Sequence, residues 1–308
     1  GHKGLVGSSL YSLLRTKGYK NLIIRNRNQL DLLDTKKVEN FFKKKKIDII
    51  INLAAQAGVR HSLENPYVYV NSNILGQVNM LELAKELKIK KYIYASSSSV
   101  YGGNKSIPFS VKDRVDNPIS LYAASKKSTE LIAEYYSHLY KIKSIGLRFF
   151  TVYGPWGRPD MATFIFTKNI INGKPINIFN YGKMKRDFTY IDDIVEGVER
   201  VLDTPAKPNV SWNGFNPDSG SSKCPWRIYN IGNNSPVNLL DYIKAIEEAL
   251  NIEADLELLP LQPGDVPETY ADVDDLLADI DYKPSMNYKK GVKNFVKWYK
   301  DYYALWKL

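Results

Sequence analysis

The chain has 308 residues, 44% of them hydrophobic, which is enough to bury one large core or two unequal cores. Its single cysteine, Cys224, excludes an internal disulfide, and no apolar run approaches the roughly 20 residues of a membrane span. The first residues carry no export signal, so we expect a cytoplasmic protein without a membrane segment. A formal net charge of +10 suits an anionic partner, either a phosphate-bearing small molecule or a nucleic acid.

The first element is a glycine turn that opens a helix expected over Leu5 to Lys17. Its spacing is that of a dinucleotide-binding turn, in which glycines let the backbone approach a pyrophosphate and the N–H groups of the helix start face it. Such a turn follows a strand, and we therefore expect the first strand of the fold to be missing from this sequence. The predicted cofactor-binding residues of the turn are Gly1, Gly4, Leu5, Val6 and Gly7.

Short apolar strands and amphipathic helices alternate as far as about residue 150. The expected strands are Asn21 to Arg25, Asp48 to Leu53, Lys91 to Ala95 and Ser144 to Phe149. The expected helices after the first are Thr35 to Lys45, Pro66 to Leu87 and Ser120 to Lys141. The alternation is typical of an α/β fold with a parallel sheet and helices on both faces, so residues 1–150 are predicted to form a Rossmann-type domain that binds NAD or NADP.

Two basic segments lie within this first half. The second strand ends in Arg25-Asn26-Arg27, where an NAD-binding protein commonly places a carboxylate, and Arg25 and Arg27 could instead meet the 2′-phosphate of NADP. The run Lys43 to Lys46 ends a predicted helix, where cations complement the helix dipole. Because no nucleic-acid-binding signature accompanies the run, we expect no nucleic-acid partner.

A tyrosine and a lysine four residues apart mark the candidate reaction centre. Tyr122 and Lys126 lie on one face of a predicted helix, where the cation favours the phenolate form of the tyrosine. Nicotinamide chemistry needs such a group to take the proton of an alcohol while hydride leaves the same carbon. The run Ser96 to Ser99 follows a buried-looking strand and places hydroxyls at its carboxyl end, where ligands of open α/β sheets bind. The candidate catalytic residues are Tyr122, Lys126, Ser97, Ser98 and Ser99, and no metal site is predicted.

After residue 150 the alternation loosens, and residues 151–308 are predicted to form mainly a smaller, nucleotide-sugar-binding lobe. Its expected strands are Ile176 to Phe179 and Arg227 to Ile231, and its expected helices are Leu239 to Leu250 and Tyr288 to Tyr303. Pro205 to Pro225, rich in Asn, Ser, Gly and Pro, is predicted to be a loop.

Five separated blocks of the sequence resemble the extended short-chain dehydrogenase/reductases and, from about residue 53, the UDP-glucuronate 4-epimerases. They are Leu53 to Arg60, Ala95 to Gly102, Arg148 to Asp160, Lys185 to Asp193 and Pro263 to Pro267. The resemblance implies that Tyr122 is the base, that Lys126 assists it and binds the nicotinamide ribose, and that Ser97 supplies the catalytic hydroxyl. It adds Ala54 and Ala55 as cofactor contacts and Gln56 and Arg60 as substrate contacts.

The amino-terminal residues resemble a different branch. The glycine turn and the segment Arg25 to Asp34 look like those of GDP-fucose synthases, which use NADPH. The resemblance to the epimerases implies tightly held NAD instead. We predict NAD as the cofactor, with NADP left open by Arg25 and Arg27.

The resemblance also implies a binding site for a UDP-sugar. Arg186 suits the diphosphate, Asp265 suits ribose hydroxyls, and Phe179 can stack on the base. Thr151 and Arg158 stand in the block that distinguishes relatives acting on acid sugars, and they are the candidates for orienting the glucuronate carboxylate.

The predicted function is therefore interconversion of UDP-glucuronate and UDP-galacturonate through a 4-keto intermediate. A UDP-glucuronate decarboxylase or another NAD(P)-dependent nucleotide-sugar epimerase or dehydratase would use the same Tyr122 and Lys126. A GDP-fucose synthase is disfavoured because the strand-end block is all serine. A nucleotide-sensing or RNA-binding protein on the same fold is the non-enzymatic alternative. The family implies a homodimer formed through the helices at Pro66 to Leu87 and Ser120 to Lys141.

Overall fold

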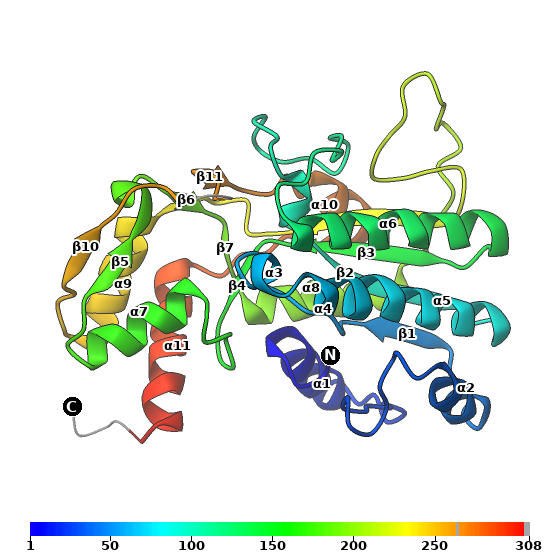
Figure 1. Cartoon of the computed structure of the whole chain (residues 1–308), viewed down its shortest axis with the longest axis horizontal. Coiled ribbons are helices and arrows are strands. Elements are labelled where there is room, and N and C mark those ends of the chain that lie inside the picture. Colours follow the sequence, from blue (N-terminus) through cyan, green and yellow to red (C-terminus); the bar gives the residue numbers. More distant parts are fainter. Residues whose placement is uncertain (263–264, 305–308) are drawn as a thin grey trace.

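A four-stranded parallel sheet forms the centre of the molecule (Figure 1). The computed structural model describes residues 1–262 and 265–304. The strands are paired in the order β1-β2-β3-β8, with Ile50 opposite Tyr92 and Ile93 opposite Ile145. Their bounds are β1 Ile49–Asn52, β2 Lys91–Ser97, β3 Ser144–Phe149 and β8 Trp226–Ile231. Since β2, β3 and β8 are buried almost throughout, side chains on both sheet faces must be covered by helices.

Two hydrophobic cores show that helices cover both faces. In one, Leu10 of α1 and Val198 of α8 pack with Ile93 and Ile145 of the sheet. In the other, Leu81 of α5 and Ala133 of α6 pack with Tyr94, which points to the opposite face because successive strand residues alternate. The predicted Rossmann-type fold is confirmed. The helices of this part are α1 Leu5–Thr16, α2 Thr35–Lys43, α3 His61–Glu64, α4 Pro66–Tyr69, α5 Gly76–Glu86, α6 Leu121–Tyr140 and α8 Ile191–Asp203.

The helix predicted from Pro66 to Leu87 is continuous but not regular. Its middle turn, η1 Val70–Leu75, is a π-helix between α4 and α5. Such a widened turn frequently lies at a functional site, since it redirects the side chains within it. Here it contains the buried Asn73.

Smaller sheets and helices form the second part of the structure, on the other side of Figure 1 from α5 and α6. β4 pairs with β7, β5 pairs with β10, and β6 lies between β11 and β9. The strands are β4 Thr151–Tyr153, β5 Ile176–Ile178, β6 Lys185–Arg186, β7 Phe188–Tyr190, β9 Val237–Asn238, β10 Leu256–Leu258 and β11 Glu268–Thr269. The helices are α7 Ala162–Ile171, α9 Leu239–Leu250 and α11 Tyr288–Tyr302, with the short 3-10 turn η3 Phe179–Gly182. Two further elements belong with the main sheet: α10 Asp274–Ile280 contacts β8, and the 3-10 turn η2 Ser98–Tyr101 follows β2.

Two expectations about strands are wrong. Residues 21–25 have no strand conformation in the described chain, because no other strand pairs with them and a strand is stabilised by its neighbour's hydrogen bonds. The strand expected at Arg227 to Ile231 was placed in the smaller lobe, but it forms β8, which pairs with β3 in the main sheet. The wider division at residue 150 stays a prediction.

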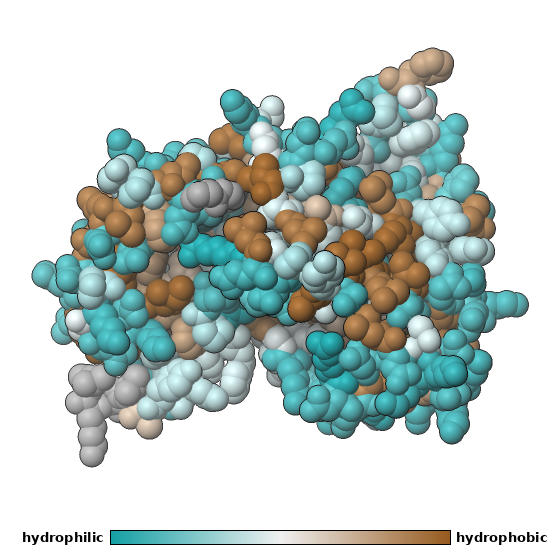
Figure 2. All heavy atoms as spheres, in the orientation of Figure 1, coloured by the Kyte–Doolittle hydropathy of each residue, from teal (hydrophilic) through white to brown (hydrophobic). Residues whose placement is uncertain are grey.

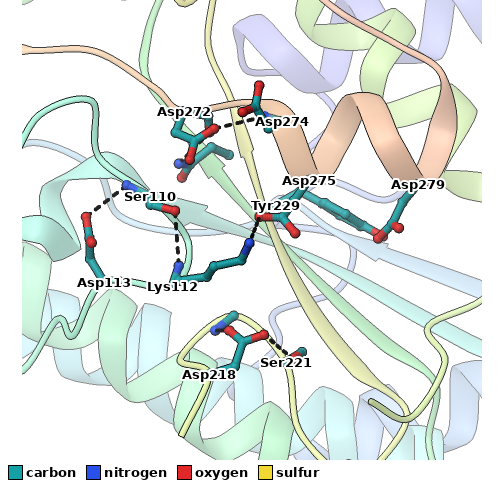
Figure 3. Close-up of polar contacts among 12 residues, drawn as sticks. Ser110, Lys112, Asp113, Asp218, Ser221, Tyr229, Asp272, Asp274, Asp275 and Asp279 are labelled. Atoms are coloured by element: carbon teal, nitrogen blue, oxygen red, sulfur yellow. Dashed lines mark hydrogen bonds and ion pairs between the residues drawn. The ribbon is translucent and has the colours of Figure 1, made fainter. Parts of the chain in front are cut away.

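A polar cluster fixes the start of β8. Arg227 forms ion pairs with Asp275 and Asp279 of α10, at 2.6 and 3.2 Å, and lies 3.9 Å from Asp218 of the long loop. Figure 3 shows Lys112 reaching toward Asp275 from a second loop. The predicted loop at residues 205–225 is confirmed, and this cluster ties its carboxyl end to β8 and α10.

Among the described residues, no helix is long and apolar enough to cross a membrane. Lys43 ends α2 and Lys44 caps it, which confirms that this basic run is the end of a helix.

Candidate active site

The start of α6 presents the predicted reaction centre. The Ser120 hydroxyl caps the helix by accepting a hydrogen bond from the Ala123 N–H at 3.1 Å, and Tyr122 and Lys126 follow on one helix face. The Lys126 side chain is only 4% exposed, and its Nζ donates to the Ala95 carbonyl at 2.9 Å. Burial lowers the pKa of Lys126 to about 8, although the nearby Glu130 charge raises it.

The serines at the end of β2 and the start of η2 have separate surroundings. The Ser97 hydroxyl hydrogen-bonds with Tyr122 and with the Ser99 hydroxyl, the latter at 3.2 Å. Burial raises the pKa of Tyr122, whereas the Ser97 hydrogen bond and the positive charge of Arg158 lower it. Ser98 starts η2, and the Ser96 hydroxyl instead bonds Glu130 at 2.6 Å. Of the predicted hydroxyls, Ser97 is therefore the one that contacts Tyr122.

Arg158 is close enough for its positive charge to lower the pKa of the same tyrosine. Its guanidinium forms a two-point ion pair with Asp160, with 3.0 Å between Nε and Oδ1. Tyr69 joins this group, since its ring lies 6.1 Å edge-on from that of Tyr122 and its hydroxyl donates to the Gly58 carbonyl at 2.7 Å. A Cβ atom on Gly58 would lie 3.2 Å from Arg158 Nη2 and 3.5 Å from the Tyr69 hydroxyl, and the φ of +111° at this position favours glycine.

Gln56 is held by a residue that the sequence pattern did not reveal. Asn73 accepts a hydrogen bond from the Gln56 N–H at 2.7 Å and donates to the Gln56 carbonyl at 3.0 Å and the Ser125 hydroxyl at 2.9 Å. Asn73 thus joins the π-helical turn to the helix of Tyr122 and Lys126. The only sign of Asn73 in the sequence is that it is a polar residue within a predicted apolar helix.

Four of the predicted substrate-binding residues lie close to one another. The Arg60 guanidinium lies 5.2 Å from the Phe179 ring centre and 4.0 Å from Asp265. Burial lowers the pKa of Arg186, and the Asp265 charge opposes that shift, so Arg186 and Asp265 interact as well. The Arg186 side chain also donates to the Pro267 carbonyl at 2.9 Å. These four predicted substrate contacts therefore form one group, while residues 263 and 264 of the same block lie outside the described residues.

Thr151 occupies the first position of β4, opposite Phe188 of β7, and is partly buried. It follows β3 after a single residue, at the carboxyl end of the main sheet.

The glycine turn has the packing that a pyrophosphate site requires. Cβ atoms on Gly1 and Gly7 would lie 2.3 and 2.2 Å from the backbone of Leu53 and Gly1, so both positions exclude a side chain. Gly4 begins α1 without a side-chain cap, and its first turn contains no acidic residue. The N–H groups of Leu5 and Val6 are therefore suited to an anion.

The other predicted cofactor-binding residues are Arg25, Ala54 and Ala55, with Arg27 as a further candidate for a 2′-phosphate. The Arg25 guanidinium lies 4.9 Å from the Phe41 ring centre, and Arg27 pairs with Asp31 at 3.1 Å. The Ala54 N–H donates to the Asn52 side chain at 3.2 Å, and Ala55 is exposed. Arg27 is thus engaged within its own loop.

A buried ion pair beneath the site was also missed. Arg148 and Glu130 are both fully buried and make two hydrogen bonds, at 2.8 and 2.9 Å. Arg148 also donates to Tyr101, whose hydroxyl donates to Asn230. Sequence spacing gives no sign of such a pair, because its members come from α6 and β3. Within residues 1–262 and 265–304, no group of three His, Cys, Asp or Glu side chains could hold a metal ion.

Comparison with known proteins defines the class. A model of the NAD dependent epimerase/dehydratase family matches residues 1–232, which end just after β8. The chain belongs to this family, and the prediction of an NAD-dependent enzyme of epimerase type is confirmed. The matched range begins at residue 1, and the likeness of the first residues to GDP-fucose synthases stays a prediction.

Named relatives are closely similar. The chain is 55% identical to Protein CapI of Staphylococcus aureus over 276 residues, which are 90% of this chain and 83% of that protein. It is 50% identical to a probable UDP-glucuronate 4-epimerase of Rhizobium meliloti, over 83% of this chain and 75% of the relative. A solved UDP-glucuronic acid 4-epimerase from Bacillus cereus, in complex with UDP-glucuronic acid and NAD, superposes with a TM-score of 0.76 and 30% identity, over 97% of this chain and 89% of the other.

Proposed function

We propose that this protein interconverts UDP-glucuronate and UDP-galacturonate, with NAD as its cofactor. The observation that carries the proposal is the group formed by Arg158, Tyr69 and Tyr122, at the centre where hydride and proton transfer would occur. A Cβ on Gly58 would lie 3.2 Å from Arg158 Nη2 and 3.5 Å from the Tyr69 hydroxyl, and the Tyr69 ring lies 6.1 Å from that of Tyr122. A cation beside the base suits a sugar that carries a carboxylate. The relatives named as UDP-glucuronate 4-epimerases support the same substrate.

Each reacting group has a role in this proposal. The Tyr122 phenolate accepts the proton of the sugar's 4-hydroxyl, and Ser97 donates a hydrogen bond to the same oxygen as it becomes a carbonyl. Lys126 lies on the same helix face and would supply a cation to the reaction centre and a ligand for the nicotinamide ribose. NAD, when bound at the glycine turn, supplies a hydride acceptor that can return hydride to the opposite face of the keto sugar.

The acid sugar imposes a further requirement. Oxidation at C4 makes a β-keto acid, which loses CO₂ when its C–CO₂ bond aligns with the carbonyl π system. Arg158 and Thr151 would hold the carboxylate out of that alignment, so that hydride returns before decarboxylation. A UDP-glucuronate decarboxylase would need the opposite orientation.

The group formed by Arg60, Phe179, Arg186 and Asp265 would bind the UDP part. Phe179 has an aromatic face for the uracil, Arg186 has a cation for the diphosphate, and Asp265 has oxygens for ribose hydroxyls. Arg60 covers Phe179 in the structure, so uracil stacking requires the Arg60 side chain to move or to stack on the other face of the base.

Product analysis tests the function. The purified protein is incubated with NAD and UDP-glucuronate, and the sugar is followed by NMR. We expect equilibration with UDP-galacturonate and no CO₂. Pentose formation would identify a decarboxylase, turnover of neutral UDP-sugars alone would identify another epimerase, and RNA binding without turnover would favour the non-enzymatic alternative.

We further propose that two chains associate through α4, η1 and α6. Apolar side chains are exposed on this face, and Figure 2 shows apolar residues gathered over the region of α5 and α6. Leu131, Tyr135 and Leu139, four residues apart on α6, are 53%, 55% and 49% exposed, and Tyr67 on the adjoining α4 is 81% exposed. An apolar stripe of this kind is typical of an interface.

Sedimentation velocity tests the dimer. Leu131→Lys with Tyr135→Lys should convert a dimer into a monomer, whereas Leu256→Lys, an exposed leucine on β10, should leave the dimer intact. A wild-type protein that sediments as a monomer at micromolar concentration would contradict the proposal. A cytoplasmic location stays a prediction.

A further inference from the structure

The loop that carries Arg158 is a tight turn with an unusual residue at its centre. The Gly157 N–H donates to the Gly154 carbonyl at 2.9 Å, and the Met161 N–H donates to the Arg158 carbonyl at 3.1 Å. Trp156, two residues before Arg158, has φ of +65°. This left-handed conformation is unfavourable for a bulky side chain, so surrounding contacts must maintain it.

Those contacts come from the far end of the chain. The Trp156 ring centre lies 5.5 Å from that of Trp298 and 5.0 Å from that of Tyr302, both on α11. The rings of Trp298 and Tyr302 stack at 5.4 Å. Trp156 is still 53% exposed, so it is not a core residue, and the turn is attached to α11 by one face of the indole.

We propose that Trp156, Trp298 and Tyr302 form an aromatic clamp through which α11 holds Arg158 beside Tyr122. Trp156 is then a positioning residue, acting on the reaction through Arg158. Asp160 fixes the guanidinium within the turn, and the clamp fixes the turn within the molecule. The catalytic consequence rests on the proposed function, because it requires Arg158 to orient the sugar carboxylate.

Trp156→Gly separates positioning from stability. Glycine accepts the positive φ without strain, so relief of strain offsets part of the lost ring packing. We expect melting close to the wild type and unchanged UDP affinity, but a kcat for UDP-glucuronate about 10- to 100-fold lower, as for a misplaced orienting group. Trp156→Phe should retain most of the turnover. Lys293→Leu changes an exposed side chain of the same helix that is no member of the clamp, and it should turn over like the wild type.

Chemical labelling tests the clamp without relying on the substrate. Phenylglyoxal modifies arginine, and mass spectrometry of peptides gives the rate at Arg158, with the exposed Arg60 as an internal reference. We expect several-fold faster modification of Arg158 in Trp156→Gly and in Trp298→Leu than in the wild type or Lys293→Leu. The rate at Arg60 should be the same in all four proteins.

The two measurements distinguish the two proposals. Equal labelling of Arg158 in wild type and both clamp variants would overturn the clamp, as would wild-type kcat in Trp156→Gly. Faster labelling of Arg158 together with a wild-type protein inactive on UDP-glucuronate would support the clamp and overturn the proposed function.

Discussion

Lys126 shows a conflict between stability and function at a single residue. The folded protein holds its ammonium group in a site that is almost closed to water, and burial lowers its pKa from 10.5 to about 8. Between these values the unfolded chain binds the proton more tightly, so the stability of the wild type rises with pH across that window. Below pH 8 both states are protonated, and the cost of burying the charge is present in full.

Lys126→Met should therefore stabilise the fold while it abolishes activity. The expected gain is at most about 3 kcal/mol below pH 8, and it should shrink as the pH rises toward 10.5. Urea unfolding at pH 7 and pH 10 measures it, with Lys20→Met at an exposed position as the control. A variant less stable than the wild type at pH 7 would show that the hydrogen bond to Ala95 outweighs the burial cost.

Tyr122→Phe should lower kcat by about three orders of magnitude, since the reaction loses its acid–base group. UDP affinity, measured by calorimetry, should stay at the wild-type value because Tyr122 lies outside the group formed by Arg60, Phe179, Arg186 and Asp265. A parallel loss of UDP affinity would mean that the phenol supports binding instead.

For single residues, the sequence predicted which side chains could take part in the reaction but not which side chains contact one another. Tyr122 and Lys126 could be found because their spacing fixes a common helix face. Asp160 escaped notice although it is two residues from Arg158, since a turn has no periodicity from which a side-chain direction follows. Ser97 could be preferred over Ser98 only by resemblance, because both follow the same strand.

Among the elements, α6 and β3 depend on the ion pair that joins them. Glu130→Gln leaves Arg148 as a buried charge without a full partner, and we expect a loss of about 3–5 kcal/mol in unfolding free energy. Removing both charges, as in Glu130→Gln with Arg148→Met, should recover part of that loss. Urea unfolding of the two variants checks this, and an equal loss in both would argue that the hydrogen bonds, and not the unpaired charge, dominate.

A second prediction concerns the hydrogen bonds of Asn73 in the π-helical turn. Asn73→Leu keeps the number and branching of the side-chain heavy atoms but removes its hydrogen bonds to Gln56 and Ser125, so the Gln56 N–H loses its acceptor. We expect about 2–3 kcal/mol of lost stability and faster hydrogen exchange at the Gln56 amide. Unchanged exchange at that amide would show that another group has replaced the asparagine.

The predicted elements were mostly right because apolar periodicity marks helices and buried strands wherever the chain is regular. The failures have physical causes. Residues 21–25 have strand composition, but composition does not supply a pairing partner. The π turn could not be expected, because Val70–Leu75 has the same apolar pattern as an ordinary helix.

For the whole molecule, Asp187 joins three distant segments. Its buried carboxylate accepts hydrogen bonds from the N–H groups of Asn233, Asn234 and Ala271, at 2.7, 3.1 and 3.0 Å. It stands next to Arg186, so the same contacts hold the proposed diphosphate ligand in place. Burial raises the pKa of this carboxyl, which the three donors oppose.

Asp187→Asn should weaken both stability and UDP binding. An amide cannot accept from all three donors, and each buried N–H left without an acceptor costs about 1–3 kcal/mol. Thermal unfolding and UDP calorimetry check the two effects, with Asp241→Asn, at an exposed position of α9, as the control. Lower stability with normal UDP affinity would separate Arg186 from this anchor.

The position of β8 also bears on how the protein is made. A ribosome delivers the chain from its amino end, so β3 is complete at residue 149 while its neighbour appears only after residue 226. In that interval one edge of β3 has no partner, and an unpaired apolar strand edge is prone to aggregation. Slow elongation through this stretch would lengthen the exposure and increase the need for a chaperone.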